Sequence, residues 1–501
     1  MNFECVKGKF PNQSKMQQNK VIKNISEVGK YSSDSNILLK TFENIIGQFR
    51  LTQVNKWLNK AKTKGVEGNH IFKILFVLVF VDLKNISQLM HSGYGTKLNH
   101  GKDVLYDFLK NEWVDWGKIL TNFSRQFLKI TQRKGDSTDI SSPKCLIIDD
   151  TLLCKTGKTI EHIGKVFDHC SRTYQLGMKA LVCGLWDGKS FIPTAFSLHN
   201  EPGKKRNRGM KNKELANQFY KERDADSPGF QRVKQLSTDK ISMSIQMVKD
   251  AIKTGFEPAY VLADSWFMCD TFVSEIQKIK IRYAKKLHVI GLMKTNRSIM
   301  INGIKKAASL VPVYKQKDIR FCKKHKCNYL AITIEYKGNK LKAFWVKTKG
   351  SETWKMLIST DTDISFSNAM KYYQIRWSIE VFFKECKQNL NINNCQSTDF
   401  DAHIAWITLS FISYMMLSLR KRFDDYETMG EVFRDFKNEL LEITMVEKLW
   451  QIIEILFQEI LAELGVDWEI FLDKLAENEI NIEKLVQTQF EFLKCPMKNA
   501  A

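Results

Sequence analysis

The chain has 501 residues, of which 44% are hydrophobic, with only 25 Gly and 8 Pro. This composition excludes collagen-like and wholly disordered chains, and the length predicts more than one domain around a large core. The 77 Lys and Arg outnumber the 55 Asp and Glu, so the formal net charge is +22. Such a balance is typical of a protein that binds polyanions, with nucleic acid the first candidate; a solvated lysine surface is the alternative.

The charge is unevenly distributed along the chain. Residues 423–501 hold 18 acidic and 7 basic residues, a balance of −11, which leaves +33 for residues 1–422. Residues 1–36 are polar and basic, and we expect a mobile arm there. The acidic residues 423–501 have an amphipathic helical pattern, and they are too acidic to lie against DNA. We therefore expect a helical region that contacts another subunit.

The cysteine pattern and the apolar runs bear on the compartment. Eleven cysteines, an odd number, are scattered without a disulfide framework, which indicates reduced thiols and a cytoplasmic protein. No signal peptide is readable at the N-terminus. Two apolar runs, residues 71–83 and 404–419, are shorter than the roughly 20 residues that a bilayer requires. We interpret both as buried core helices and expect no membrane segment.

The order of expected elements predicts helices first and an α/β domain after them. Residues 37–135 have helical periodicity and form either a DNA-end-binding domain or a purely structural cap. From residue 140 to residue 422 we expect a mixed α/β domain. Its expected strands cover residues 145–153, 176–186, 190–198, 260–264 and 289–293, and its expected helices cover residues 241–253 and 367–389. Alternating residues at about 294–360 predict a β-rich insertion, and Asp187-Gly188 is a strong hairpin signal.

Acidic residues end two of the expected strands and lie on the late helix. They are Asp149 or Asp150, Asp264 and Glu380. Three converging carboxylates repel one another unless cations neutralise them, and hard divalent ions prefer oxygen ligands. Two Mg²⁺ ions, or Mn²⁺ in their place, would suit phosphodiester displacement. Taken singly, each Asp is more often a turn or cap residue.

The late helix carries a polar face next to an apolar one. At 100° per residue, Tyr373, Arg376, Glu380 and Lys387 fall within an arc of about 60°. A carboxylate flanked by cations on one face is suited to handling phosphate groups, and Lys384 adds a further cation nearby. The alternative is an ordinary surface helix with a salt link between Glu380 and Lys384. That alternative does not explain why the other polar residues share the arc of Glu380.

This pattern resembles a known family. Tyr373, Arg376, Glu380 and Lys387 match the Tyr-x2-Arg-x3-Glu-x6-Lys signature of the insertion sequence 4 family of DDE transposases. The segments around Asp149-Asp150-Thr151 and Asp264-Ser-Trp-Phe resemble the first and second acidic strands of that family. The likeness covers about residues 140–420 and implies a ribonuclease H-like fold and a bacterial, nucleoid-associated protein. The Asp-x-Thr spacing of the family favours Asp149 over Asp150, which strand alternation places on the opposite face.

Further DNA contacts are expected at two places. In related enzymes a Trp of the insertion stacks on a base flipped out at the transposon end, and Trp354 lies in the matching position. The alternative for Trp354 is a strand core residue that alternates with Met356 and Ile358. The second place is a basic loop, which is either a track for the DNA backbone or a solvated loop. The cations expected to contact DNA in this loop are Lys204, Lys205, Arg206 and Arg208.

We therefore expect a transposase that cleaves transposon ends with metal ions and joins them to target DNA. In this hypothesis Asp149, Asp264 and Glu380 bind two Mg²⁺ ions, and the protein forms a homodimer on DNA. The resemblance implies cut-and-paste transposition. The alternatives are a catalytically silent DNA-binding protein of transposase descent and a nuclease on the same fold without joining activity.

Overall fold

A computed structural model describes residues 46–80, 85–91, 98, 100–136, 142–168, 171–200, 209–281, 286–424 and 426–435, with residues 456, 458, 460, 461 and 465. The expected basic arm, the loop with Lys204, Lys205, Arg206 and Arg208, and most of the acidic region 423–501 lie outside these residues. The described architecture belongs to the unit Phe42–Lys437.

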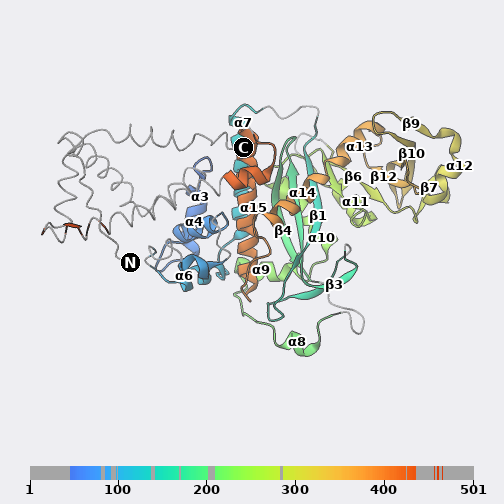
Figure 1. Ribbon diagram of the computed structural model, residues 1–501. Helices are drawn as coiled ribbons and strands as arrows, with labels where there is room; N and C mark the ends of the chain where they lie inside the picture. Colours follow the sequence, from blue (N-terminus) through green and yellow to red (C-terminus); the bar gives the residue numbers. More distant parts are fainter. Residues whose placement is uncertain are drawn as a thin grey trace, which may run out of the picture. The chain divides into compact units, whose positions relative to one another are not determined.

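Helices make up the first part of the described chain (Figure 1). They are α3 (Thr52–Ala61), α4 (Gly68–Leu78), α5 (Ile86–Met90), α6 (Lys102–Leu109) and α7 (Trp116–Arg133). The expected apolar run at residues 71–83 lies largely in α4, which is buried over most of its length. Asp115 caps α7 by accepting a hydrogen bond from the backbone N–H of Lys118. One face of α7 packs on strand β4 (Phe191–His199) and on helix α15 (Phe400–Phe423).

Twelve strands among the described residues form one mixed sheet. Besides β4, the other eleven are β1 (Cys145–Cys154), β2 (Gly164–Asp168), β3 (Thr173–Trp186), β5 (Tyr260–Ala263), β6 (His288–Met293), β7 (Ser298–Ile301), β8 (Ile304–Ala307), β9 (Arg320–Cys322), β10 (Cys327–Tyr336), β11 (Asn339–Thr348) and β12 (Lys355–Ser359). β4, β3 and β1 pair antiparallel in that order, and β1, β5 and β6 pair parallel. The expected hairpin at Asp187-Gly188 is confirmed, with Gly188 at φ +111°.

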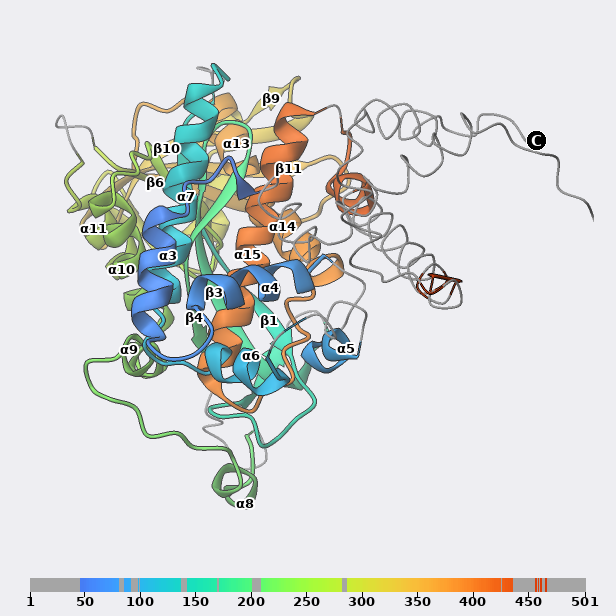
Figure 2. The ribbon, with the colours of Figure 1, turned by 90° about the vertical axis from the view of Figure 1, so that its left-hand side faces the viewer.

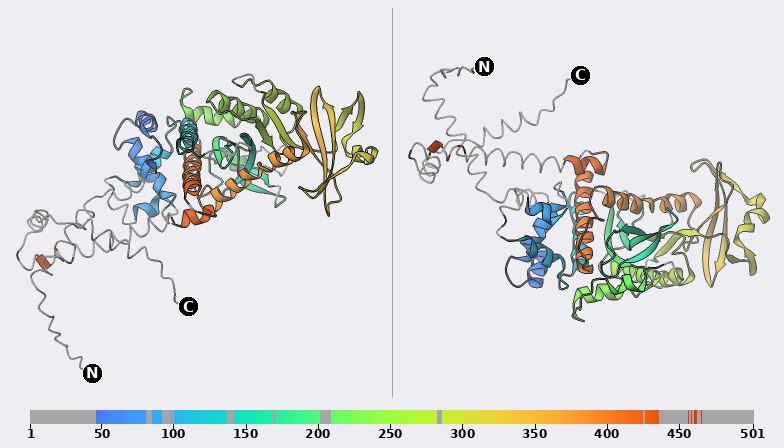
Figure 3. Two further views of the ribbon diagram at one scale, coloured as in Figure 1. Left: turned by 90° about the horizontal axis from the view of Figure 1, so that it is seen from above. Right: turned by 60° about the horizontal axis from the view of Figure 1, so that its bottom comes forward.

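The expected β-rich insertion has a more specific arrangement than its alternating pattern indicates. β12 pairs antiparallel with β6, and β11, β10, β7 and β8 follow outward from it. The core sheet therefore continues into this lobe without a break in hydrogen bonding. Figure 3 shows these strands at the end of the described unit that lies away from the first helices.

Helices cover the sheet and bring late residues onto the early strands. They are α8 (Asn212–Ala216), α9 (Pro228–Gln235), α10 (Lys240–Lys253), α11 (Asp270–Gln277), α12 (Val311–Tyr314), α13 (Phe366–Gln374) and α14 (Trp377–Gln388), together with α15. α14 contacts β1, whereas α10 contacts β3 and β4. The prediction of one continuous helix over residues 367–389 was wrong, because α13 and α14 are separated at Ile375 and Arg376.

The break between α13 and α14 is a tightened turn. The backbone N–H of Ile375 donates to the carbonyl of Tyr372, and that of Arg376 donates to Tyr373, at 3.1 Å each. Each of these bonds joins residues three apart in the chain, as in a 3₁₀-helix, which is wound more tightly than an α-helix. Both residues nevertheless keep right-handed helical dihedrals. The chain direction is therefore maintained, and Tyr373 stays next to Arg376.

Helix α15 is the central buried helix. It is long and apolar enough to cross a membrane by length and composition, but the whole of that apolar window is buried. Figure 2 shows α15 and α7 in front of strands β1, β3 and β4. Phe411 of α15 contacts Phe196 of β4 and Phe382 of α14, with ring centroids 5.3 Å and 4.8 Å apart. The expectation of a buried core helix at residues 404–419 is confirmed.

A buried ionic cluster fixes the start of α15. Arg223 donates to Glu161 at 2.6 Å and to Asp401 at 2.9 Å, and Lys221 donates to Asp401 at 2.8 Å. The backbone N–H of Phe400 also donates to Glu161. Arg223 and its acidic partners are each no more than 4% exposed. We call these residues, together with Asp399, the Arg223 cluster; it connects three separate segments of the chain.

Candidate active site

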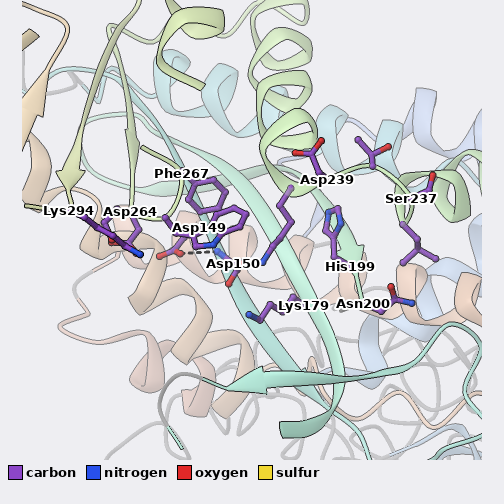
Figure 4. Close-up of a pocket in the computed structure, with 15 residues that line it drawn as sticks. Asp149, Asp150, Lys179, His199, Asn200, Ser237, Asp239, Asp264, Phe267 and Lys294 are labelled. Carbon is purple, nitrogen blue, oxygen red and sulfur yellow. Dashed lines mark hydrogen bonds and ion pairs between the residues drawn. The ribbon is translucent and has the colours of Figure 1, made fainter. Parts of the chain in front are cut away.

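Parallel strand pairing brings the first two acidic strand ends together. The register of β1 and β5 pairs Ile148 with Ala263, so the next residues, Asp149 and Asp264, are neighbours at one edge of the sheet. Both side chains line a cavity of about 690 Å³, shown in Figure 4. Burial is the largest cause of the raised pKa of Asp149, and the nearby negative charge of Asp264 raises it further.

A glycine on the third parallel strand keeps this edge closed. Gly291 of β6 pairs with Ala263, and a Cβ atom there would collide with Met268 and with the carbonyl oxygen of Ala263. Any larger residue would push β6 away from β5 or displace Met268. Because Asp264 directly follows Ala263, the close approach at Gly291 helps to fix the position of that carboxylate.

The third acid, Glu380, is linked to Asp149 by a shared arginine. Arg376, which immediately precedes α14, donates to Asp149 at 2.9 Å and to Glu380 at 2.5 Å. These two contacts bring Asp149 of β1 and Glu380 of α14 to the same cation, one at each terminal nitrogen. Glu380 therefore pairs with Arg376, four residues before it. The surface-helix alternative predicted a pair with Lys384 instead.

Aromatic packing explains why α14 lies over β1. The ring centroid of Phe382 is 4.9 Å from that of Phe191 on β4 and 4.7 Å from that of Tyr414 on α15. The ring of Phe191 occupies the space that a side chain on Gly184 of β3 would need. A glycine on one strand thus makes room for the ring that positions the helix of Glu380.

The other members of the helical face also lie near these acids. The Arg376 guanidinium is 5.7 Å from the ring centroid of Tyr373, and Lys387 donates to the hydroxyl of Thr151 at 2.7 Å. Thr151 is two residues after Asp149, so it faces the same side of β1. Tyr373, Arg376, Glu380 and Lys387 are therefore brought together along one face of β1. Lys384 is exposed on α14.

Asp149 and Asp150 have different partners. Asp149 contacts Arg376 before α14, whereas Asp150 accepts a hydrogen bond from Lys240 of α10 at 2.8 Å. Successive residues of a strand face opposite sides of a sheet, so α14 and α10 cover opposite faces of β1. Asp149 is the member of the pair that shares a cation with Glu380.

Burial and neighbouring charges perturb the ionisation of the site. Burial raises the pKa of Asp149 to about 7, against the opposing effects of Arg376 and of the backbone N–H of Asp150. Burial also raises the pKa of Tyr373 to about 12, and the charges of Asp264 and Asp149 act in the same direction. Burial disfavours the charged form of Arg376, but Tyr373, Asp149 and Glu380 raise its pKa overall. Burial therefore disfavours the ionised form of Asp149, and a bound cation would relieve that penalty.

Trp354 lies at the same edge of the sheet by register. β12 runs antiparallel to β6, with Met356 opposite Met293, so Trp354 comes before β12 at the edge where β1, β5 and β6 end. It is half-buried and precedes the strand, which is contrary to the alternative that made it a strand core residue.

Sequence reasoning missed several cavity residues. Lys294 follows β6 directly and lines the cavity with Asp149 and Asp264. Figure 4 shows these three residues at one end of the cavity, with His199 and Asn200 at the other. Lys240 also lies 4.5 Å from the ring centroid of Trp266. The sequence could have predicted Lys294 in the cavity, because this residue directly follows a third parallel strand. No pattern in the sequence indicated that Lys240 pairs with Asp150.

The donor set suits a hard divalent ion, although the side chains do not yet form a closed cage. Within the described ranges, no three His, Cys, Asp or Glu side chains lie close enough together to hold a metal ion as they stand. In this arrangement Asp149 and Glu380 each pair with the Arg376 guanidinium. Carboxylate oxygens are the ligands that Mg²⁺ and Mn²⁺ prefer, so the chemistry of the residues fits such an ion.

The sheet order and the acidic edge are compatible with one class of protein. A mixed sheet of this kind within an α/β architecture fits the ribonuclease H-like fold of DDE endonucleases. Comparison with protein families agrees: residues 233–416 match the family model of the transposase DDE domain, and residues 88–293 match that of the DDE superfamily endonuclease. No curated protein matches the chain.

The two matches divide the acids between them. Asp149 lies in the endonuclease match, Glu380 lies in the transposase match, and Asp264 lies in both. The matches support a DDE transposase or nuclease, an enzyme that acts on DNA. Enzymes of this class generally use divalent metal ions.

Proposed function

We propose that this protein is a DNA transposase of the insertion sequence 4 type, which cuts element ends and joins them to target DNA. The observation that carries the proposal is the single guanidinium shared by Asp149 and Glu380, next to Asp264 across the β1–β5 pairing. A simple surface helix would not need its Arg, Glu and Lys aligned along an acidic strand.

We assign Asp149, Asp264 and Glu380 as the ligands of two Mg²⁺ ions, with Mn²⁺ as a substitute. Bound there, such ions would activate a water or a 3′-hydroxyl and stabilise the leaving oxygen of the phosphodiester. Asp150 is excluded from this role in the proposal because its carboxylate pairs with Lys240 on the other face of β1.

The chain's own cations orient the DNA in this proposal. Arg376 presents a planar set of donors that can hold a phosphate in two-point fashion, and Tyr373 supports the guanidinium from one side. Lys387 and Lys384 extend the positive face along α14, where each can contact a phosphate as a point charge. Trp354 at the same sheet edge would stack on an extruded base.

A cleavage and strand-transfer assay tests the proposal. The substrate is the DNA that flanks the gene, incubated with full-length protein, Mg²⁺ or Mn²⁺ and a target plasmid. We expect nicking and covalent joining that require the metal, and a loss of rate of about 10²- to 10³-fold or more in Glu380→Gln, with DNA binding retained.

Glu385→Gln is the matched control, because Glu385 lies on the same helix and accepts a hydrogen bond from Asn389 instead of Arg376. It should cleave and join as the wild type does. Cleavage without joining would favour a nuclease on this fold. Tight binding without cleavage by the wild type in either metal would favour a silent DNA-binding protein of transposase descent.

A further inference from the structure

The far end of the sheet carries an unusual surface made of β8 and α12. Sixteen large apolar side chains are exposed among the described residues, and four of them lie in the eleven residues from Ile304 to Tyr314. These four side chains, Ile304, Leu310, Val313 and Tyr314, are each between 45% and 68% exposed. We call them, with Lys305, Lys306, Lys315 and Lys317, the β8–α12 patch. Its apolar side chains are too concentrated to be the scattered exposed residues that any surface has.

The patch is held rigidly from below. The indole N–H of Trp345, itself fully buried, donates to the carbonyl of Ala308 at 2.8 Å. Val311 and Pro312 are buried, and the backbone N–H of Lys315 donates to Val311 at 3.0 Å. The apolar side chains are therefore presented by an anchored segment, which lowers the entropy lost when something binds to them.

The net charge of the patch is positive. Residues 305–318 contain four lysines and one acidic residue, Asp318, which pairs with Lys315 at 3.4 Å and leaves a net charge of +3. The ammonium of Lys306 lies 5.4 Å from the ring centroid of Tyr314, which ties the edge strand to α12. Lysine is depleted from protein–protein interfaces, whereas lysines next to exposed aromatic and apolar side chains suit a nucleic acid. Charge complementarity therefore favours a polyanion over a second protein surface.

The position of the patch fits DNA that continues away from the cleavage point. Five strand-to-strand steps separate β6 from β8, through β12, β11, β10 and β7. At about 4.8 Å per step this is a lateral distance of about 24 Å. Phosphates on one DNA strand are about 3.4 Å apart along the axis, so a duplex covers that distance in about seven base pairs.

We propose that the β8–α12 patch is a second DNA-contacting surface, which holds the duplex about seven base pairs from the phosphodiester at the acidic edge. This inference rests on the proposed function for the identity of the substrate as DNA. The lysines contact phosphates, and Val313, Tyr314 and Leu310 pack against sugars and bases at the groove edge. The enzyme would then hold the duplex at two separate points, the β8–α12 patch and the polar face of α14.

The test is binding of full-length protein to element-end duplexes over a range of salt concentrations. One duplex extends about fifteen base pairs on each side of the cut, which is about twice the seven base pairs estimated between the cut and the patch. The others are trimmed to about four base pairs on one side or the other. We expect Lys305→Gln/Lys306→Gln to reduce the slope of log Kobs against log salt by about 1.8, the loss of two phosphate contacts. Val313→Ser/Tyr314→Ser should weaken binding about fivefold or more without changing that slope.

Both effects should vanish on one of the two trimmed duplexes. The control Lys253→Gln/Lys278→Gln removes the same charge from two exposed lysines of α10 and the α11 end, and it should not change the slope. Equal losses in the patch and control variants would overturn the inference. It would also be overturned if the patch variants altered the oligomeric state while DNA binding stayed unchanged, because the surface would then bind protein.

Failure of the inference is distinguishable from failure of the proposed function. If the wild type cleaves and joins DNA but the patch variants bind like the control, only the patch assignment falls. If the wild type neither binds nor cleaves element-end DNA, the proposed function fails first.

Discussion

Two arginine-centred groups of acids in this chain have similar composition and opposite character. The Arg223 cluster gives Glu161, Asp399 and Asp401 two cations, and its arginine and acids are at most 4% exposed. The active-site group gives Asp149, Asp264 and Glu380 one arginine, and its paired side chains are 16% to 33% exposed. The first group is closed and satisfied by its own donors. The second is partly exposed and open to a cavity, which is why we assign chemistry to it and structure to the other.

The largest expected effect comes from breaking the closed cluster. Arg223→Met leaves Glu161 and Asp401 without their buried partner, and we expect the free energy of unfolding to fall by about 3–5 kcal/mol. Urea denaturation followed by circular dichroism measures this change. A loss below about 1 kcal/mol, the value typical of exposed pairs, would show that the cluster is not the structural clamp that its burial indicates.

The next largest expected effect is a loss of stability in acid, to which His199 at the cavity contributes and Glu161 of the Arg223 cluster does not. Burial lowers the pKa of His199, which lines the cavity, to about 4, from an ordinary value of 6.5. The unfolded chain therefore binds the proton first, and stability falls as pH decreases from 6.5 towards 4, by about 3 kcal/mol in total. Hydrogen bonds from Arg223 help to hold the pKa of Glu161 below its ordinary value against burial, so Glu161 stays ionised through most of this window.

Unfolding free energies at pH 7, 5.5 and 4.5 check the acid effect. His199→Gln should flatten the dependence on pH in this window, whatever its effect on stability at pH 7. An unchanged slope in the variant would mean that other groups cause the loss.

The open group should lose activity without losing its fold. Arg376→Met removes the shared cation, and we expect cleavage of element-end DNA to slow by about 10²-fold or more because a donor to the phosphate is lost. The effect on the free energy of unfolding should be only about 1 kcal/mol, because the pair is partly exposed and screened by solvent. The reverse result, a large loss of stability with normal turnover, would make Arg376 a second structural clamp.

The smallest expected effect concerns the pair on the other face of β1. Lys240→Gln removes the partner of Asp150 and should cost about 1 kcal/mol of stability, since both side chains are partly buried. Lys249→Gln is the matched control on the same helix, because its pair with Glu275 is longer and more exposed. Thermal denaturation of the two variants should show a shift only for Lys240→Gln.

The acidic strand ends were predictable because parallel strands share an edge. The strands expected at residues 145–153 and 260–264, which are β1 and β5 in the structure, were recognisable as short apolar runs. Their acids had to be neighbours once the two strands paired. Strand alternation indicated that Asp149 and Asp150 diverge. It could not indicate which face α14 covers, since that depends on the long-range packing of Phe382 against Phe191 and Tyr414.

Two other features depended on contacts that local patterns do not contain. The helical arc of Tyr373 and Arg376 assumed one continuous helix, but the turn at Ile375 separates α13 from α14. The alternating residues after position 294 predicted strands, whereas the pairing of β12 with β6 that extends the sheet is a contact across about 65 residues of chain. The placement of Trp354 at the acidic edge follows from that pairing alone.

The register of β1 against β5 has a consequence for how such a protein can change in length. Asp149 and Asp264 are held together by four paired residues on each strand, and not by the chain that connects the strands. Insertions in surface connections, such as the tight turn at Lys337-Gly338 between β10 and β11, leave that pairing untouched. Such surface connections can therefore lengthen or shorten while the two carboxylates keep their positions, so the geometry of the acidic edge is independent of the length of the loops around it.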